Sequence, residues 1–99
     1  MTKKPPPLEN SIVKSITEFL KNIPECRCVK THGSLRRQGE PDLYIVHRGQ
    51  FYAIEVKRPG NKATRLQEAT LAKWEQAGAV TGVAYSRDDV KRIMGMVEP

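Results

Sequence analysis

The stretch EPDLYIVHRGQFYAIEVK, residues 40–57, constrains the fold of this chain more than any other segment. The runs PDLYIVH and QFYAIEV have the composition of β-strands, and Arg48-Gly49 between them is typical of a two-residue hairpin turn. A hairpin closed by this turn places Asp42 directly opposite Glu55. Because like charges in facing positions repel, a cation is expected beside them.

Side chains alternate along a strand, so Lys57 shares a face with Glu55 and Asp42. The two carboxylates and the backbone carbonyl of Val56 form an oxygen-rich set that suits Mg²⁺, with Mn²⁺ as a substitute. Lys57 then stands where it can orient or deprotonate an attacking water, an arrangement that phosphodiester hydrolysis needs. In the alternative interpretation the three residues are a salt-bridge trio on an edge strand, and Lys57 only neutralises the acids.

Segment 8–23 places an acid on the buried face of a predicted helix. Its apolar residues recur at helical spacing, and Pro24 ends the pattern. Glu9 lies within the apolar arc, whereas Glu18 lies on the solvent side. A carboxylate directed into a buried face needs a partner, and a metal site beneath the helix would supply one for Glu9.

Gln67 shows the same conflict in a second predicted helix, residues 65–77. It shares a stripe with Leu71 and Trp74, which places an amide on an otherwise apolar face. Gln67 also completes a capping box with Thr64. A capping role and a site role therefore both remain open.

The remaining segments give the order αβββαβα, which predicts an α/β protein. A first strand is expected at 26–32, a basic loop follows in HGSLRRQGE, and a short strand is expected at 80–85. Ser86 and Asp89 cap a last helix. The apolar stripe of that helix comprises Val90, Ile93, Met94 and Val97.

The 99 residues suffice for one core, so residues 8–99 are predicted to form a single domain after a flexible, basic, proline-rich arm at 1–7. Seventeen Lys and Arg against eleven Asp and Glu give a formal charge of +6, which favours polyanions. The chain has no apolar run that could span a membrane and no signal peptide, so a cytoplasmic location is expected. Cys26 and Cys28 are expected to be buried free thiols.

The PD motif at 41–42 and the ExK motif at 55–57, in this order of elements, resemble the PD-(D/E)XK nuclease superfamily. More narrowly, the chain resembles the VRR-NUC family. The narrower resemblance depends on Glu9, on the Gly-containing loop that leads into GEPD, on the short hairpin and on Gln67. It covers about residues 8–97, which is nearly the whole chain.

The resemblance implies a restriction-endonuclease-like core, with a mixed four-stranded sheet flanked by helices. It implies that Asp42 and Glu55 bind a divalent metal directly, together with the Val56 carbonyl. Lys57 would assist the attacking water, and Glu9 and Gln67 would complete the site through metal-bound water or substrate phosphate. The motif is intact, because an apolar residue is allowed at Val56.

Basic residues fall on both sides of the predicted metal site, where they would contact phosphates without reading bases. These candidate DNA-binding residues are Arg36, Arg37, Arg58, Lys62 and Arg65. An ordinary solvated surface is the alternative for such residues, and it is preferred for Lys14, Lys21 and Lys91.

The resemblance is to the small stand-alone type found in phages and bacteria, which acts in DNA repair and recombination. The favoured hypothesis is a Mg²⁺-dependent endonuclease that cuts four-way (Holliday) junctions as a homodimer, in a bacterial or phage-infected cytoplasm. Exposed residues of the last strand and helix, such as Tyr85, Ile93 or Met96, are candidates for the dimer contact, and a place in the core is the alternative for the same residues. The alternatives are a flap- or end-trimming nuclease and a non-catalytic basic module that binds nucleic acid. No membrane partner or organic cofactor is expected.

Overall fold

The computed structural model describes residues 8–31 and 38–96. The described elements, in chain order, are α1 (Glu9–Leu20), β1 (Cys26–Lys30), β2 (Leu43–His47), β3 (Gln50–Val56), α2 (Arg65–Gln76), β4 (Val80–Ala84) and α3 (Arg87–Ile93). This order confirms the predicted α/β class and the succession αβββαβα. The predicted arm at 1–7, most of the predicted basic loop and Val97 lie outside the described residues.

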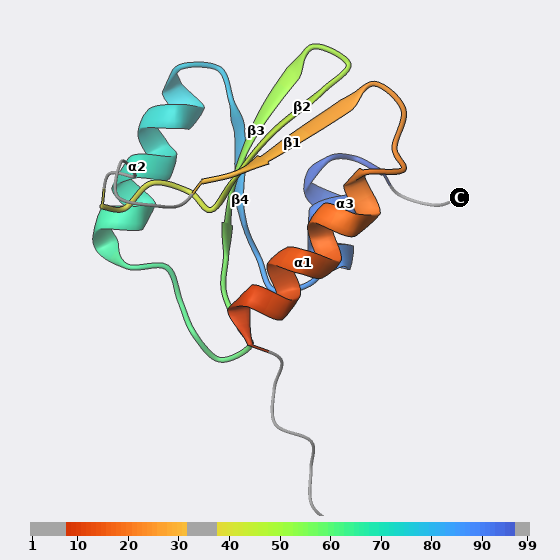
Figure 1. The fold of residues 1–99 in the computed structure, drawn as a ribbon. Coiled ribbons are helices and arrows are strands. Elements are labelled where there is room, and N and C mark those ends of the chain that lie inside the picture. Colours follow the sequence, from red (N-terminus) through yellow and green to blue (C-terminus); the bar gives the residue numbers. More distant parts are fainter. Residues whose placement is uncertain (1–7, 32–37, 97–99) are drawn as a thin grey trace, which may run out of the picture.

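The four strands form one mixed sheet in the order β1-β2-β3-β4 (Figure 1). β1, β2 and β3 pair antiparallel, and β4 runs parallel to β3. Leu43 faces Ile54, so the predicted hairpin register is confirmed. Arg48 and Gly49 have φ values of 48° and 83°, and a turn with two positive φ angles matches the twist of the flanking strands.

Helices cover both faces of the sheet, with α2 on one side and α1 and α3 on the other (Figure 1). A parallel strand pair needs a crossover connection, and α2 provides it between β3 and β4. The main apolar core lies between the sheet and the pair formed by α1 and α3. Its fully buried side chains include Ile16, Leu20, Leu43, Ile45, Ile54, Val56 and Val90.

The capping residues of the second and third helices were predicted correctly. Thr64 Oγ1 accepts a hydrogen bond from the Gln67 backbone, and Ser86 Oγ accepts one from the backbone of Asp89. The predicted end of α1 was wrong. This helix ends at Leu20 instead of Ile23, because the chain turns before Pro24. No described helix has the length and apolar character that a membrane span requires.

The expectation that both cysteines are buried was wrong. Cys26 and Cys28 are free thiols, but each is only partly buried, because β1 lies at the edge of the sheet. Burial, with a smaller contribution from the charge of Cys26, raises the pKa of Cys28 to about 11. The Cys28 thiol therefore stays protonated at neutral pH.

The expectation of exposed residues for a dimer contact was also wrong. Ile93 and Met96 are partly buried and pack against the main core, and Tyr85 is partly buried as well. Gly82 on β4 explains the position of Ile93. A Cβ atom on Gly82 would lie 2.5 Å from Ile93 Cδ1, so the missing side chain gives Ile93 its space.

Candidate functional site

Three carboxylates that are distant in sequence meet at one end of the sheet. Glu9 begins α1, Asp42 directly precedes β2, and Glu55 is the penultimate residue of β3. One potential ligand atom of each lies within 4.8 Å of the other two. Glu55 is 1% exposed, whereas Glu9 and Asp42 are partly buried. The predicted convergence of these three acids is therefore present in the structure, and the other acid of α1, Glu18, is exposed as expected.

Asp42 is held by contacts to its side chain and to its backbone. Its Oδ2 accepts a hydrogen bond of 2.8 Å from the backbone N–H of Val56, and its carbonyl accepts one of 2.9 Å from Thr31. The Thr31 hydroxyl also donates to the carbonyl of Pro41. Thr31 thus joins the end of β1 to the PD motif. Sequence reasoning missed this residue, because the register of β1 against β2 has no short turn to define it.

Pro41 withholds from the Val56 carbonyl a hydrogen bond that a regular strand residue would donate. If the register of β2 on β3 is extended by two positions beyond Leu43 and Ile54, Pro41 lies opposite Val56. In a regular antiparallel sheet the two residues at this position would exchange backbone hydrogen bonds. Proline has no amide hydrogen, so Pro41 cannot donate to the Val56 carbonyl as a strand residue would. The Val56 N–H bonds to Asp42 Oδ2 instead. The proline of the motif thus ends the ladder beside the acids.

Gln67 forms the predicted cap and also contacts Glu55, while its role in a site stays a prediction. Its Oε1 accepts a hydrogen bond of 2.9 Å from the Thr64 backbone, which completes the capping box at the start of α2. Its Nε2 donates to Glu55 Oε1 over 3.1 Å. The cap fixes the orientation of the amide, so Gln67 presents a donor to the carboxylate of Glu55.

Lys57 provides positive charge beside the buried acid. Its Nζ lies 4.0 Å from Glu55 Oε1, and its side chain is 13% exposed. The backbone N–H of Lys57 donates to the carbonyl of Ala84 over 3.0 Å, which continues the β3–β4 pairing by one residue. Lys57 is therefore held on the acid-bearing face, as the alternation of side chains predicted.

A second polar contact to α2 lies on the same face. Glu40 Oε2 accepts hydrogen bonds from the Tyr44 hydroxyl (2.8 Å) and from Trp74 Nε1 (3.1 Å). The rings of Tyr44, Phe51 and Trp74 lie 5.2 to 5.6 Å apart, centre to centre. Helix α2 is thus fixed by Gln67 in its first turn and by Trp74 further along. Glu40 was not predicted, although its place two residues before Asp42 indicates the shared face.

The predicted DNA-binding residues are described in part. Arg58 and Lys62 lie on the connection from β3 to α2, and Arg65 is the first residue of α2. Lys62 and Arg65 are exposed, and Arg58 is partly buried. Arg36 and Arg37 lie outside the described residues. The described basic residues therefore follow the chain as it leaves the acid cluster.

The donor set of the acid cluster fits a small divalent cation. Carboxylate oxygens are the ligands that Mg²⁺ and Mn²⁺ prefer in proteins. In an octahedral Mg²⁺ site with metal–ligand distances of about 2.1 Å, two ligands on opposite sides of the ion lie about 4.2 Å apart. Oxygens within 4.8 Å of one another therefore need only a small adjustment, or one intervening water, to share an ion.

Comparison with solved structures gives the class of this fold. One structure described as "VRR_NUC domain" has a TM-score of 0.72 and 23% identity, and the match covers 91% of this chain and 97% of that one. Another, described as "VRR_NUC domain protein", has a TM-score of 0.73 and 18% identity, and covers 92% and 88%. No protein-family model and no curated protein matches the sequence. The expected resemblance to VRR-NUC domains is thus confirmed in the fold.

Proposed function

We propose that this chain is a metal-dependent endodeoxyribonuclease of the VRR-NUC type that hydrolyses phosphodiesters in branched DNA. The observation that carries the proposal is the acid cluster of Glu9, Asp42 and Glu55, within 4.8 Å of one another and beside Lys57. The fold supports it, since the similar structures are described as VRR_NUC domains. The net charge of +6 supports a polyanionic substrate.

Each residue of the site has a proposed task. Asp42, Glu55 and the Val56 carbonyl would hold Mg²⁺ or Mn²⁺, and Glu9 would join them directly or through water. The bound ion would stabilise the negative charge that develops on the phosphoryl oxygens.

The other two site residues would act on water and on Glu55. Lys57 would orient the attacking water and balance charge, and Gln67 would keep the carboxylate of Glu55 in one orientation. The basic residues Arg58, Lys62 and Arg65, together with Arg36 and Arg37, would contact phosphates on either side of the cut.

The proposed substrate is a four-way DNA junction, and the proposed working unit is a homodimer. A junction must be cut on two symmetry-related strands to give intact duplexes, and the described part of one chain carries one acid cluster. A two-fold dimer with both sites on the same side is the simplest arrangement that meets the symmetry of the substrate. We place this activity in the cytoplasm of a bacterium or of a phage-infected cell.

The test combines substrate choice with solution mass. The purified protein is incubated with an immobile four-way junction, a flap, a nicked duplex and a linear duplex of related sequence, in Mg²⁺, in Mn²⁺ and in chelator. We expect paired cuts in the junction, no cutting in chelator and the mass of a dimer. Preference for flaps or ends, or a monomer, would favour the trimming nuclease. Retention of every substrate without cutting would favour the non-catalytic binding module.

A further inference from the structure

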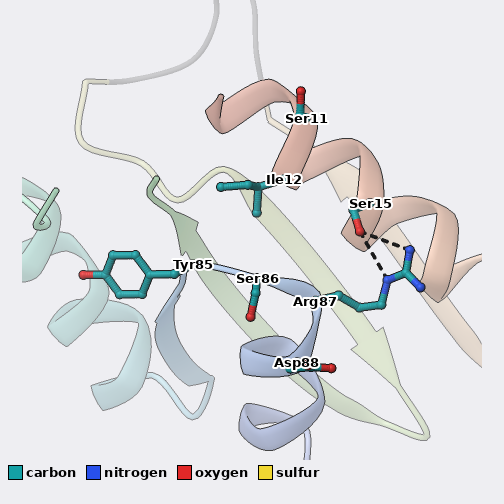
Figure 2. A pocket seen from close by; sticks show the side chains of 7 residues that line it. All are labelled: Ser11, Ile12, Ser15, Tyr85, Ser86, Arg87 and Asp88. Atoms are coloured by element: carbon teal, nitrogen blue, oxygen red, sulfur yellow. Dashed lines mark hydrogen bonds between the residues drawn. The ribbon is translucent and has the colours of Figure 1, made fainter. Parts of the chain in front are cut away.

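A pocket of about 430 Å³ lies between α1 and the junction of β4 with α3. Its size is within the usual range for ligand sites, about 300 to 1,000 Å³. The lining is rich in hydroxyl groups and carries one guanidinium; it comprises Ser11, Ile12, Ser15, Tyr85, Ser86, Arg87 and Asp88 (Figure 2). None of these residues belongs to the acid cluster.

Arg87 is the oriented cation of this pocket. Its Nε and Nη2 donate to Ser15 Oγ over 3.2 and 3.1 Å, as the dashed lines in Figure 2 show. Its guanidinium also lies over the ring of Phe19, 5.8 Å from the centroid. An arginine has five N–H donors in a fixed fork. Within the described residues Ser15 uses only one side of that fork, so Nη1 can donate to an anion.

The carboxylate of the pocket lining lies beside a cation. Asp88 Oδ1 is 3.8 Å from Lys91 Nζ, and Lys91 shares the Phe19 ring with Arg87, 5.0 Å from its centre. The lining itself carries one cation, Arg87, and one carboxylate, Asp88. An anion would therefore be bound by the donors of Arg87 and not by an excess of positive charge in the lining.

Two residues of the pocket lining are close in the chain to residues of the proposed site or to their partners. Ile12 in its lining is one helical turn after Glu9 and lies on the same side of α1. Tyr85 in its lining directly follows Ala84, whose carbonyl accepts the N–H of Lys57. The basic connection after β3 leads from the cluster toward α2 instead. A DNA strand held at the acid cluster would therefore meet this pocket where the strand runs along α1 and α3.

We infer that the pocket is a subsite for the DNA backbone, in which Arg87 binds the phosphate of a nucleotide flanking the scissile bond. The inference depends on the proposed nuclease function for the identity of the scissile bond. Ser15 is a positioning residue, since its hydroxyl oxygen accepts two hydrogen bonds from the guanidinium of Arg87. The subsite uses no base edge, so it adds affinity and register without sequence preference.

The test compares Arg87→Gln with Arg27→Gln, which removes the same charge from an exposed position on β1. Retention of a junction is measured in chelator over a series of salt concentrations. Arg87→Gln should weaken retention about tenfold, as expected for one charge-assisted hydrogen bond. The slope of log affinity against log salt should fall by about 0.9, which corresponds to one lost phosphate contact. Ser15→Ala should give a smaller loss, and Arg27→Gln should leave the slope unchanged.

A second measurement locates the phosphate. Neutral methylphosphonates are placed one at a time beside the cut, and cleavage in Mg²⁺ is measured for each. One position should slow the wild-type protein and Arg27→Gln, while Arg87→Gln should be insensitive to it, having already lost that contact.

The two proposals fail in different ways. If the wild-type protein cuts DNA and Arg87→Gln has the salt slope and methylphosphonate profile of Arg27→Gln, the subsite is wrong and the nuclease stands. If the wild-type protein cuts no DNA, the proposed nuclease function is wrong, and the retention of DNA by the two variants tests the subsite. Selective weakening by Arg87→Gln then supports a DNA-backbone site, and equal retention by both variants overturns it.

Discussion

The two faces of the sheet are built from different chemistry, although they share the same strands. The face toward α1 and α3 carries Leu43, Ile45 and Ile54, all of them 0% exposed. The face toward α2 carries Asp42, Tyr44 and Glu55 on neighbouring positions of the same two strands. Alternation along a strand therefore lets one hairpin serve a core and a polar site at once.

Stability and chemistry are located on different faces of the sheet. Apolar contacts on the α1–α3 face are non-directional and contribute in proportion to buried area. Groups on the α2 face depend on defined partners, such as Gln67 for Glu55 and Trp74 for Glu40. Substitutions on the first face should therefore change stability, and substitutions on the second should change activity.

The largest expected effect is that of Asp42→Asn on cleavage. A metal ion supplies several kcal/mol of charge stabilisation, so losing a ligand should lower the rate about a thousandfold or more. The amide oxygen can still accept the Val56 N–H, and one of the repelling charges is gone. The melting temperature in chelator should therefore stay the same or rise.

Cleavage rate and melting temperature, each with and without Mn²⁺, check this prediction. Mn²⁺ should raise the melting temperature of the wild-type protein and leave that of the variant unchanged. A variant that cuts at the wild-type rate would contradict the two-acid metal site.

Ile45→Ala tests the opposite face. Deleting this buried side chain should lower the free energy of unfolding by about 2 to 5 kcal/mol, with little change in the cleavage rate per folded molecule. Val46→Ala is the matched control, since Val46 is the next residue of β2 and is 42% exposed. It should cost less than about 0.5 kcal/mol. Urea titration measures both, and equal losses would contradict the assignment of the core face.

Glu9→Gln and Glu18→Gln compare two acids of one helix. Glu9→Gln should reduce cleavage about 10- to 100-fold, the range seen when groups around a metal are removed, and DNA retention should change little. Glu18→Gln should change neither, because Glu18 is exposed on the far side of α1. Equal rates for the two variants would remove Glu9 from the site.

Trp74→Phe tests whether the aromatic layer, formed by the rings of Tyr44, Phe51 and Trp74, supports the site by holding α2 in place. The ring is kept, but the donor to Glu40 is lost, so unfolding should become easier by about 1 to 2 kcal/mol. If Trp74 helps to place Gln67, the cleavage rate of the folded protein should also fall a few-fold. A loss of stability with an unchanged rate would limit this layer to a structural role.

Cys28 gives the smallest effect, a difference in thiol labelling with pH. Its side chain faces the core, and its pKa is raised from 9.0 to about 11. The thiolate is the reactive form, and the folded Cys26→Ser variant keeps the burial of Cys28, which is the larger cause of the raised pKa, so its labelling should keep rising above about pH 9. Labelling of the urea-unfolded variant should level off above about pH 9. A folded-state profile that levels off with the unfolded one would contradict the raised pKa.

Features determined by nearby residues could be predicted from the sequence. The hairpin register followed from a two-residue turn, and the caps of α2 and α3 followed from Thr64 and Ser86. Glu9 could be placed beside Asp42 and Glu55 because an acid in an apolar arc is a conflict that a partner must resolve.

Features that depend on pairing distant segments could not be predicted. The contacts of Thr31 require the register of β1 on β2 across a long connection, and those of Glu40 require the position of Trp74 along the sheet. Ile93 and Met96 could not be assigned to the surface or to the core, because a short stripe does not show which neighbour covers it. The pocket around Arg87 joins segments more than 70 residues apart.

The hydrogen bond from Val56 to Asp42 makes one amide proton a reporter on the site. In the interior of a sheet an amide exchanges with solvent only when the ladder opens, but the Val56 N–H is held by a carboxylate over 2.8 Å. Its exchange rate should therefore respond when a metal ion captures the side chain of Asp42. Nuclear magnetic resonance could then titrate the site at a single backbone position, with no DNA in the tube.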